Sequence, residues 1–255
     1  MNCPLVIKSH NSYSYLWKII NDYVQNLDLE IYLCLNRNDT EFEFDKRITV
    51  LEYDENLSYP QRMSSILEKL NDDYVFISHD VDLILDFDKN KFNEYLDMVK
   101  SFSLDRLSLG VFNNPSEEIC VNNNSICALT HTTKNFYTPF DYAPSICDRK
   151  SFIEFYNEFP DDTYGSLELN QKAQNYFKEN MKSYGIQKQI GDKLIYHRGM
   201  VYSEFFNFLH ITIKGGLLND PYYYDLTEKK NEIVSKYGLD FLPRHNTNPI
   251  DKQEL

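Results

Sequence analysis

An excess of basic residues, long apolar runs and paired cysteines are all lacking from this sequence of 255 residues. It carries 26 Lys and Arg against 39 Asp and Glu, which is a formal net charge of −13. Because affinity for nucleic acid and for anionic lipid comes mostly from clustered Lys and Arg, this balance argues against both partners. The composition therefore favours a small molecule, or a partner without strong charge, as the binding partner.

No segment is typical of a secretory signal or of a membrane anchor. The first residues, Met1 to Lys8, do not place a basic stretch before a long apolar run. The longest apolar stretches have the length of a strand, far short of the roughly 20 residues that cross a bilayer. We therefore expect no direct membrane anchor.

The cysteines do not form the pattern of a disulfide framework. They are odd in number, and none belongs to a Cys-x-x-Cys pair. The five are Cys3, Cys34, Cys120, Cys127 and Cys147. Buried thiols in a reducing compartment are expected, which means the cytoplasm, or the cytoplasm of a host if the chain is viral.

The first hundred residues alternate between strand and helix patterns. Short β-branched runs predict strands, and apolar residues at intervals of three and four predict amphipathic helices. The predicted strands cover 5–7, 31–35, 48–51 and 74–78, and the predicted helices cover 15–24, 58–70 and 92–102. The second helix opens with Ser58 as its cap and Pro60 in its first turn. This alternation predicts an α/β fold with an open sheet flanked by helices.

The pattern continues less regularly in the second half of the chain. Strands are predicted at 107–112, 126–129, 144–147 and 193–196, and helices at 149–158, 166–182 and 226–237, with a polar loop over 113–124. No internal repeat and no sharp change of composition divides the chain.

The strongest candidate for chemistry is the run Ser78-His79-Asp80-Val81-Asp82, directly after the predicted strand at 74–78. Alternate residues of an extended chain point to the same side, so Asp80 and Asp82 would present two carboxylates at the carboxyl edge of the sheet. Ligands of open α/β sheets bind at that edge, and paired oxygen ligands suit Mg²⁺ or Mn²⁺. The competing interpretation is that an Asp here caps the next element.

An ordered series of segments resembles glycosyltransferase family 2 and related GT-A glycosyltransferases. The segments are Glu52 to Ser65, Asp73 to Asp82, Ala143 to Phe152, Ser166 to Asn170 and Ile195 to Gly199. In that family an Asn-containing loop and an Arg-bearing helix precede a strand that ends in Asp-x-Asp. The resemblance implies a GT-A fold, a Rossmann-like mixed sheet, and use of a nucleotide-sugar donor with Mn²⁺ or Mg²⁺.

The same resemblance implies roles for the acidic residues. Asp80 and Asp82 match metal-binding positions, with Asp80 also near the ribose, and His197 matches a His that completes the metal site. Glu168 matches the catalytic base, which would make the transfer inverting. Glu168 is equally interpreted as a solvated helix residue, and His197 as a structural histidine. Asp161 and Asp162 compete with Glu168 for the role of base.

Nucleotide contacts follow from the resemblance as well. The residues that match these positions are Ser9, His10 and Asn11 after the first strand, Asn36 or Asp39 after the second, and Arg62 on the helix before Asp80. A UDP-sugar is the expected donor. Arg62 would meet phosphate, or it is a surface arginine paired with Glu55 or Asp54.

The resemblance divides the chain into regions. It implies a catalytic domain over 1–200, with a nucleotide-binding half over 1–88 and an acceptor half over 89–200. An aromatic and helical extension over 201–242 and a polar tail over 243–255 follow.

The expected function is metal-dependent transfer of a sugar to a hydroxyl of a glycan or lipid-linked acceptor. One alternative is a GT-A-like module that binds sugar or nucleotide without turnover, which the absence of a second acid at Leu167 favours. The other is a metal-dependent phosphohydrolase built on His79 and Asp80 with His10 and His197.

Overall fold

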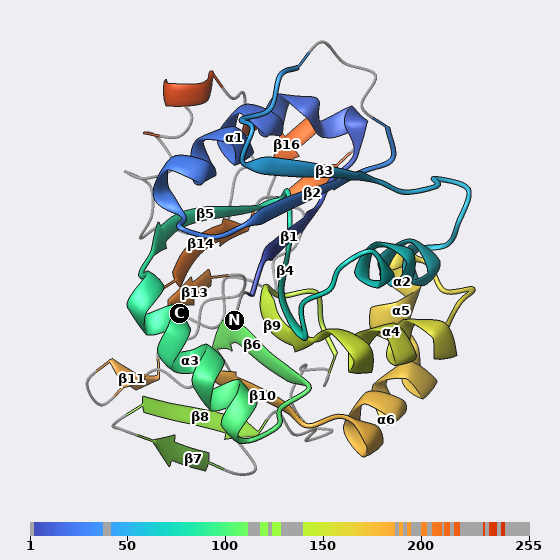
Figure 1. Cartoon of the computed structure of the whole chain (residues 1–255), viewed down its shortest axis with the longest axis vertical. Coiled ribbons are helices and arrows are strands. Elements are labelled where there is room, and N and C mark those ends of the chain that lie inside the picture. Colours follow the sequence, from blue (N-terminus) through green and yellow to red (C-terminus); the bar gives the residue numbers. More distant parts are fainter. Residues whose placement is uncertain are drawn as a thin grey trace.

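The computed structural model describes residues 3–37, 42–111, 118–121, 124–128, 140–186, 189–190, 193–194, 200–202, 206–210, 212–214, 217–219, 232, 235–238 and 241–242. Its centre is a nine-stranded sheet of order β3-β2-β1-β4-β9-β6-β10-β8-β7 (Figure 1). The strands are β1 (Leu5–Lys8), β2 (Ile31–Leu35), β3 (Ile48–Glu52), β4 (Tyr74–His79), β6 (Arg106–Val111), β7 (Glu118–Val121), β8 (Asn124–Ala128), β9 (Ser145–Asp148) and β10 (Ser183–Ile186).

The sheet is mixed, as the sequence predicts. Strands β3, β2, β1 and β4 are parallel neighbours, whereas β9 lies antiparallel between β4 and β6. Beyond them β10 is parallel to β6, and the hairpin of β7 and β8 forms the edge. The prediction of an open α/β sheet is confirmed.

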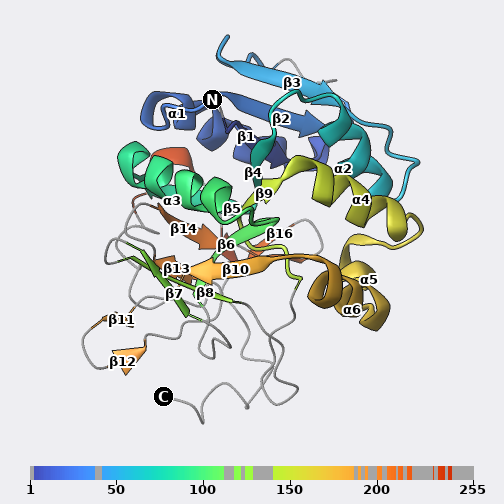
Figure 2. The ribbon, with the colours of Figure 1, turned by 60° about the horizontal axis from the view of Figure 1, so that its bottom comes forward.

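Helices cover both faces of this sheet. They are the 3₁₀ turn η1 (Asn11–Leu16), α1 (Trp17–Asn26), α2 (Tyr59–Glu68), α3 (Lys89–Ser101), α4 (Arg149–Glu158), α5 (Tyr164–Leu169) and α6 (Gln171–Asn180). Helices α1 and α3 lie on one face, and α2 and α4 lie on the other (Figure 2). Within the described residues, no helix is long and apolar enough to span a bilayer.

The core consists of two apolar clusters separated by the sheet. Leu5 and Ile7 of β1 belong to the cluster under α1 and α3, whereas Val6 belongs to the cluster under α2 and α4. All three side chains are buried, because a central parallel strand is covered on both faces. Side chains along β1 alternate between the two faces of the sheet, so the position of a residue in the strand decides which face it occupies.

Local capping explains where the helices begin. The Ser58 side chain accepts from the Gln61 backbone, and the Gln61 side chain accepts from the Ser58 backbone, with Pro60 in the first turn of α2. Asp88, Asp148 and Thr163 cap α3, α4 and α5 in the same way, each accepting from a backbone N–H of the first turn. The predicted start of the second helix is confirmed.

One helix prediction and one loop prediction in the second half of the chain are wrong in part. The single helix predicted over 166–182 is two helices, because Asn170 is extended and caps α6 through its side chain. The loop predicted over 113–124 contains β7, which pairs with β8.

A strand that the sequence analysis missed follows Asp80. Strand β5 (Asp82–Phe87) leaves the main sheet and pairs with β14 (Phe206–His210), which in turn pairs with β13 (Met200–Tyr202). The aromatic segment after residue 200 therefore lies against the chain that follows the two aspartates.

Further short strands form small sheets apart from the main one. They are β11 (Gln189–Ile190) with β12 (Lys193–Leu194), and β15 (Thr212–Lys214) with β16 (Leu217–Asn219) and β17 (Phe241–Leu242). The strand predicted at 193–196 is confirmed at β12, and most of the helix predicted over 226–237 lies outside the described residues.

Candidate active site at the carboxyl edge of strands β1 and β4

The candidate site lies where β1 and β4 end side by side. The two strands are parallel, with Lys8 opposite His79. From β1 the chain leads through α1 to β2 on one side, and from β4 it leads to strands on the other side. Such a reversal of strand order opens a crevice at the carboxyl edge of a sheet.

Asp80 is held at this edge of the sheet by a buried chain of hydrogen bonds. The Ser9 hydroxyl donates to Asp80 Oδ2 at 2.6 Å, and Trp17 Nε1 donates to Ser9 Oγ at 3.1 Å. Trp17, the single tryptophan of the sequence, is fully buried. These bonds fix the rotamer of a carboxylate at the strand end.

Ser9 is also tied to its neighbours through its backbone. Its backbone N–H donates to the Cys34 carbonyl at 2.9 Å, and its carbonyl accepts from the Tyr53 hydroxyl at 2.7 Å. These bonds hold Ser9 at the end of β1, where its side chain orients Asp80.

Asp82 reaches the same region by a turn rather than by continued extended chain. Asp80 and Val81 form a turn between β4 and β5, and Asp82 Oδ2 accepts from the His79 backbone N–H at 3.3 Å. The side chains of Asp80 and Asp82 are both buried, with residue exposures of 6% and 3%. The geometry expected from strand alternation is therefore wrong, although the two carboxylates still lie near each other.

The pKa of Asp80 reflects its burial. Burial raises the pKa of Asp80 to about 6, and the Ser9 hydrogen bond and the charge of Lys8 oppose that rise while Asp82 adds to it. Asp82 has a basic neighbour as well, since His79 Nδ1 lies 3.8 Å from its Oδ2. A divalent cation prefers oxygen ligands such as these two carboxylates.

Among the described residues, no group of three or more His, Cys, Asp and Glu side chains is arranged to hold a metal. Of the three expected ligands, the described residues include Asp80 and Asp82. His197, the expected third ligand, lies outside the described residues.

Lys8 is a functional candidate that the sequence analysis did not single out. Its Nζ lies 5.9 Å from the ring centre of Tyr53 and 5.5 Å from that of Tyr59. Burial lowers the pKa of Lys8, and the charge of Asp80 partly offsets this effect. The only signal in the sequence was a lysine at the last position of a buried strand.

The loops after β1, β2 and β3 meet in a polar cluster beside the crevice. The Asn36 amide donates to Asn11 Oδ1 at 3.0 Å and to Glu55 Oε2 at 2.8 Å, and the Asn11 backbone N–H donates to Asn36 Oδ1 at 2.9 Å. His10 Nε2 lies 3.9 Å from the same Glu55 carboxylate. Burial, followed by the charge of Lys8, lowers the pKa of His10.

This cluster unites three of the residues expected around a nucleotide, namely His10, Asn11 and Asn36. Glu55 joins them, although the sequence suggested only a pairing with Arg62. Asp39, the other candidate after β2, lies outside the described residues.

Arg62 supports the loop after β3. Its Nε donates to the Leu57 carbonyl at 2.7 Å, its Nη2 donates to the Glu55 carbonyl at 2.5 Å, and its guanidinium lies 5.6 Å from the Tyr53 ring. The ion pair with the Glu55 or Asp54 carboxylate is replaced by bonds to the backbone of this loop. Arg62 therefore shapes the segment that presents Glu55.

Glu168 lies on α5, across an aromatic group from the two aspartates. The charges of Asp82, Glu168 and Asp80 all act on the Tyr164 phenol and, together with the larger effect of burial, raise its pKa. Glu168 is half-buried, and its backbone carbonyl accepts from the buried Gln174 amide at 2.6 Å. The backbone of α5 at Glu168 is thus fixed by α6.

The two rivals of Glu168 are placed differently. Asp162 accepts from the Ser166 hydroxyl at 2.8 Å and from the Asn170 amide at 2.7 Å, which ties both ends of α5 together. Asp161 is exposed. Of the three acids, Glu168 is the one whose charge acts on Tyr164 together with the charges of Asp80 and Asp82.

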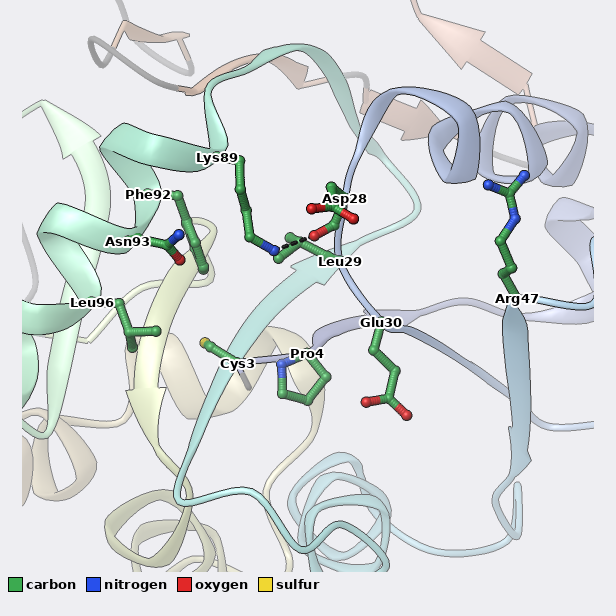
Figure 3. A pocket seen from close by; sticks show the side chains of 10 residues that line it. All are labelled: Cys3, Pro4, Asp28, Leu29, Glu30, Arg47, Lys89, Phe92, Asn93 and Leu96. Atoms are coloured by element: carbon green, nitrogen blue, oxygen red, sulfur yellow. Dashed lines mark hydrogen bonds between the residues drawn. The ribbon is translucent and has the colours of Figure 1, made fainter. Parts of the chain in front are cut away.

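A separate pocket of about 640 Å³ opens at the other edge of the sheet (Figure 3). It lies at the amino ends of β1, β2 and β3, away from Asp80, and Figure 3 shows Lys89 bonded to the backbone of Asp28 across it. Its other cation, Arg47, is paired with Asp45 at 2.9 Å. Because ligands of such sheets bind at the carboxyl edge, we assign the site to the crevice at Asp80.

No protein-family model and no curated protein matches the sequence. Solved structures do match, among them the bifunctional IspDF of Campylobacter jejuni, at 11% identity over 74% of this chain and 50% of the other, with a TM-score of 0.44. Residues 1–349 of S. aureus TarS match at 11% identity over 74% and 59%, with a TM-score of 0.45.

The 2-C-methyl-D-erythritol 4-phosphate cytidylyltransferase of Francisella tularensis matches at 14% identity over 74% of this chain and 92% of the other, with a TM-score of 0.45. This last protein is one that its name describes as a cytidylyltransferase. The aligned part spans only about half the length of the first of these three chains. Since all three TM-scores are below 0.5, no residue role is transferred from these structures.

Proposed function

We propose that this chain is a metal-dependent glycosyltransferase, which moves a sugar from a nucleotide-sugar donor to a hydroxyl of a glycan or lipid-linked acceptor. The observation that carries the proposal is the buried pair of Asp80 and Asp82 at the carboxyl edge between β1 and β4, with Lys8 beside it. Two buried carboxylates at the carboxyl edge of a sheet suit a site for a divalent metal and a diphosphate.

In this proposal Asp80 and Asp82 hold Mn²⁺ or Mg²⁺, and His197 is the third protein ligand. A bound cation would supply the positive charge that stabilises the departing nucleoside diphosphate. Ser9 and Trp17 fix the orientation of Asp80 through their hydrogen bonds. The polar cluster of His10, Asn11, Asn36 and Glu55 provides donors and acceptors for a base, for which uracil is our first choice.

Glu168 is the proposed general base. It removes the proton of the acceptor hydroxyl while that oxygen attacks the anomeric carbon, so the configuration inverts. Its half-buried position supports this role, as does the action of its charge on Tyr164, which also feels the charges of Asp80 and Asp82. The engagement of Asp162 by Ser166 and Asn170 argues against the nearest rival.

Two alternatives from the sequence lose support. Leu167 is completely buried in the apolar cluster under α2 and α4, so packing accounts for the absence of an acid at that position. A phosphohydrolase site is disfavoured because His79 Nε2 is bonded to the Tyr59 hydroxyl at 3.0 Å, and His10 Nδ1 accepts from the Ser12 backbone at 3.1 Å.

Thermal unfolding with UDP, GDP, CDP and ADP, each with Mn²⁺ and with EDTA, tests the donor site. A ligand that binds only the folded chain stabilises it by about 2.7 kcal/mol at a hundred times its dissociation constant. We expect a Mn²⁺-dependent rise of the midpoint with UDP. Absence of any rise at millimolar concentrations of all four nucleotides would refute the donor site.

The matched variants are Asp82→Asn and Asp161→Asn, because the first removes a buried carboxylate and the second an exposed one. The rise should vanish in the first and persist in the second. For the base, Glu168→Gln should keep the rise with UDP and Mn²⁺ but lose about 100-fold or more of transfer from a UDP-sugar. Retained transfer would move the role to Asp161 or Asp162.

A further inference from the structure

The most unusual arrangement near the site is a stack of two tyrosine rings. Tyr142 and Tyr164 lie 4.0 Å apart between ring centres at an interplanar angle of 16°. The Tyr142 hydroxyl also donates to the Tyr164 carbonyl at 2.5 Å. Tyr164 opens α5, the helix that carries Glu168, so the stack sets the position of that helix.

Other aromatic rings pack around Tyr142 and Tyr164. Phe140 lies 5.1 Å from Tyr142 and nearly perpendicular to it, and it packs in turn on Phe155 and Phe177. Tyr59 is 5.3 Å from Tyr142 and 5.0 Å from Tyr164, and His79 is 5.8 Å and 5.5 Å from the same two rings.

These distances place Tyr59 and His79 at the side of the stack. A ring covering the outer face of Tyr164 would lie about twice the stacking distance from Tyr142, and neither Tyr59 nor His79 does. Among the described residues, no aromatic ring covers the outer face of Tyr164. The residue is 42% exposed, although it borders the buried aspartates.

Three acids lie near enough to Tyr164 for their charges to raise the pKa of its phenol. They are Asp80 in the turn after β4, Asp82 at the start of β5 and Glu168 one turn further along α5. An aromatic face beside carboxylates suits a pyranose ring, because the ring C–H groups pack on the aromatic face while the hydroxyls donate to the acids. The surrounding negative charge disfavours a sugar that carries a carboxylate.

We propose that the outer face of Tyr164 is the platform on which a neutral pyranose of the acceptor stacks, with its reacting hydroxyl towards Glu168. This inference rests on the proposed glycosyl transfer. It assigns the ring to the acceptor rather than to the nucleobase, because the polar cluster around Asn36 and Glu55 lies at the loops after β2 and β3.

Saturation-transfer NMR with methyl β-D-glucopyranoside, methyl β-D-galactopyranoside and the methyl glycoside of N-acetylglucosamine tests the platform. The samples contain the full chain with saturating UDP and Mn²⁺. At least one glycoside should show transfer that is strongest at its ring C–H protons. The glucuronide counterpart should bind at least about threefold more weakly.

Three variants locate the effect. Tyr164→Ala should weaken glycoside binding by about 3- to 10-fold, which corresponds to the loss of one aromatic contact, whereas Tyr164→Phe should retain it. Phe102→Ala, at an exposed aromatic on the turn after α3, should change nothing. Thermal unfolding of each variant checks that it is folded.

The outcomes separate this inference from the proposed function. If no glycoside binds, or if Tyr164→Ala binds as the wild type does, the platform is wrong. A retained Mn²⁺-dependent rise with UDP in the same samples would leave the donor site standing. If the rise with UDP is absent while a glycoside still needs Tyr164, the platform is correct and the donor site is wrong.

Discussion

At the scale of single residues, the site depends on how one carboxylate is oriented. The hydrogen bonds of Ser9 and Trp17 decide where Asp80 Oδ2 points. Groups that hold a metal ligand from behind commonly account for 10- to 100-fold in metal affinity. Substitution of Ser9 or Trp17 should therefore weaken the proposed metal site while both Asp80 and Asp82 remain in place.

Ser9→Ala is therefore expected to lower the affinity for Mn²⁺ by about tenfold or more. The measurement is a Mn²⁺ titration followed by calorimetry, and by the fluorescence of Trp17, which is the single tryptophan. Ser12→Ala, at an exposed serine of the following turn, is the control and should bind Mn²⁺ as the wild type does. Equal affinities of the two variants would remove Ser9 from the site.

The raised pKa of Asp80 also has a consequence for the metal-free chain. Because the folded protein binds this proton more tightly than the unfolded chain, stability from this group is present below about pH 4 and is lost as the pH rises towards the folded pKa of about 6. Asp80→Asn removes the charge while keeping an oxygen that accepts from Ser9.

In EDTA we expect Asp80→Asn to be more stable than the wild type at pH 7.5 by roughly 1 to 3 kcal/mol, and nearly equal to it at pH 4. Urea unfolding at both pH values measures the difference. Added Mn²⁺ should reverse the order, since the wild type alone keeps both carboxylates. A variant less stable than the wild type at pH 7.5 in EDTA would contradict the raised pKa of Asp80.

At the scale of elements, α5 is short, and its position depends on contacts with other segments. The buried amide of Gln174 on α6 donates to the carbonyls of Glu168 and Phe140, and it accepts from the Phe140 backbone N–H. Arg106, also buried, donates to Ser145 Oγ at 2.9 Å and to the Asp141 carbonyl at 3.1 Å. Gln174 and Arg106 together fix the segment from Phe140 to Ser145, which carries Tyr142.

Gln174→Ala is expected to reduce the free energy of unfolding by about 2 to 4 kcal/mol, because it leaves several buried backbone groups without partners. Gln171→Ala, at an exposed glutamine on the same helix, should change it by less than about 0.5 kcal/mol. Denaturant unfolding of both variants is the measurement. Similar values for the two would mean that Gln174 does not hold α5.

At the scale of the whole molecule, the net charge of −13 means that folding brings like charges together. Salt screens this repulsion, since the Debye length falls from about 10 Å at 0.1 M to about 3 Å at 1 M. The midpoint of thermal unfolding at pH 7.5 should therefore rise with NaCl concentration.

The pH provides the control for this effect. Near the isoelectric point of about 4.9, the net charge approaches zero and the dependence on NaCl should be much smaller. A rise of the same size at both pH values would indicate a general effect of salt on the exposed surface instead of screening. The measurement is thermal unfolding over a series of NaCl concentrations at each pH.

The sequence by itself determined the order of the elements from β1 to β4 and the position of Asp80 directly after β4. The apolar runs of β1, β2, β3 and β4, the cap at Ser58 and the run His79-Asp80-Val81-Asp82 are local features, and local burial leaves a periodic trace in a sequence. The strands within residues 189–255 were harder to predict, because a short strand such as β14 shows no pattern of its own in the sequence and is defined by its pairing with β5.

Only the tertiary structure decided which residues meet at the site. Ser9 and Asp80 are 71 positions apart, and they touch because β1 and β4 are adjacent in the sheet. The stacking of Tyr164 on Tyr142 depends in the same way on two segments 22 positions apart in the chain. Periodicity reports which face of an element is buried, whereas contacts between elements depend on strand order and packing, which no local pattern contains.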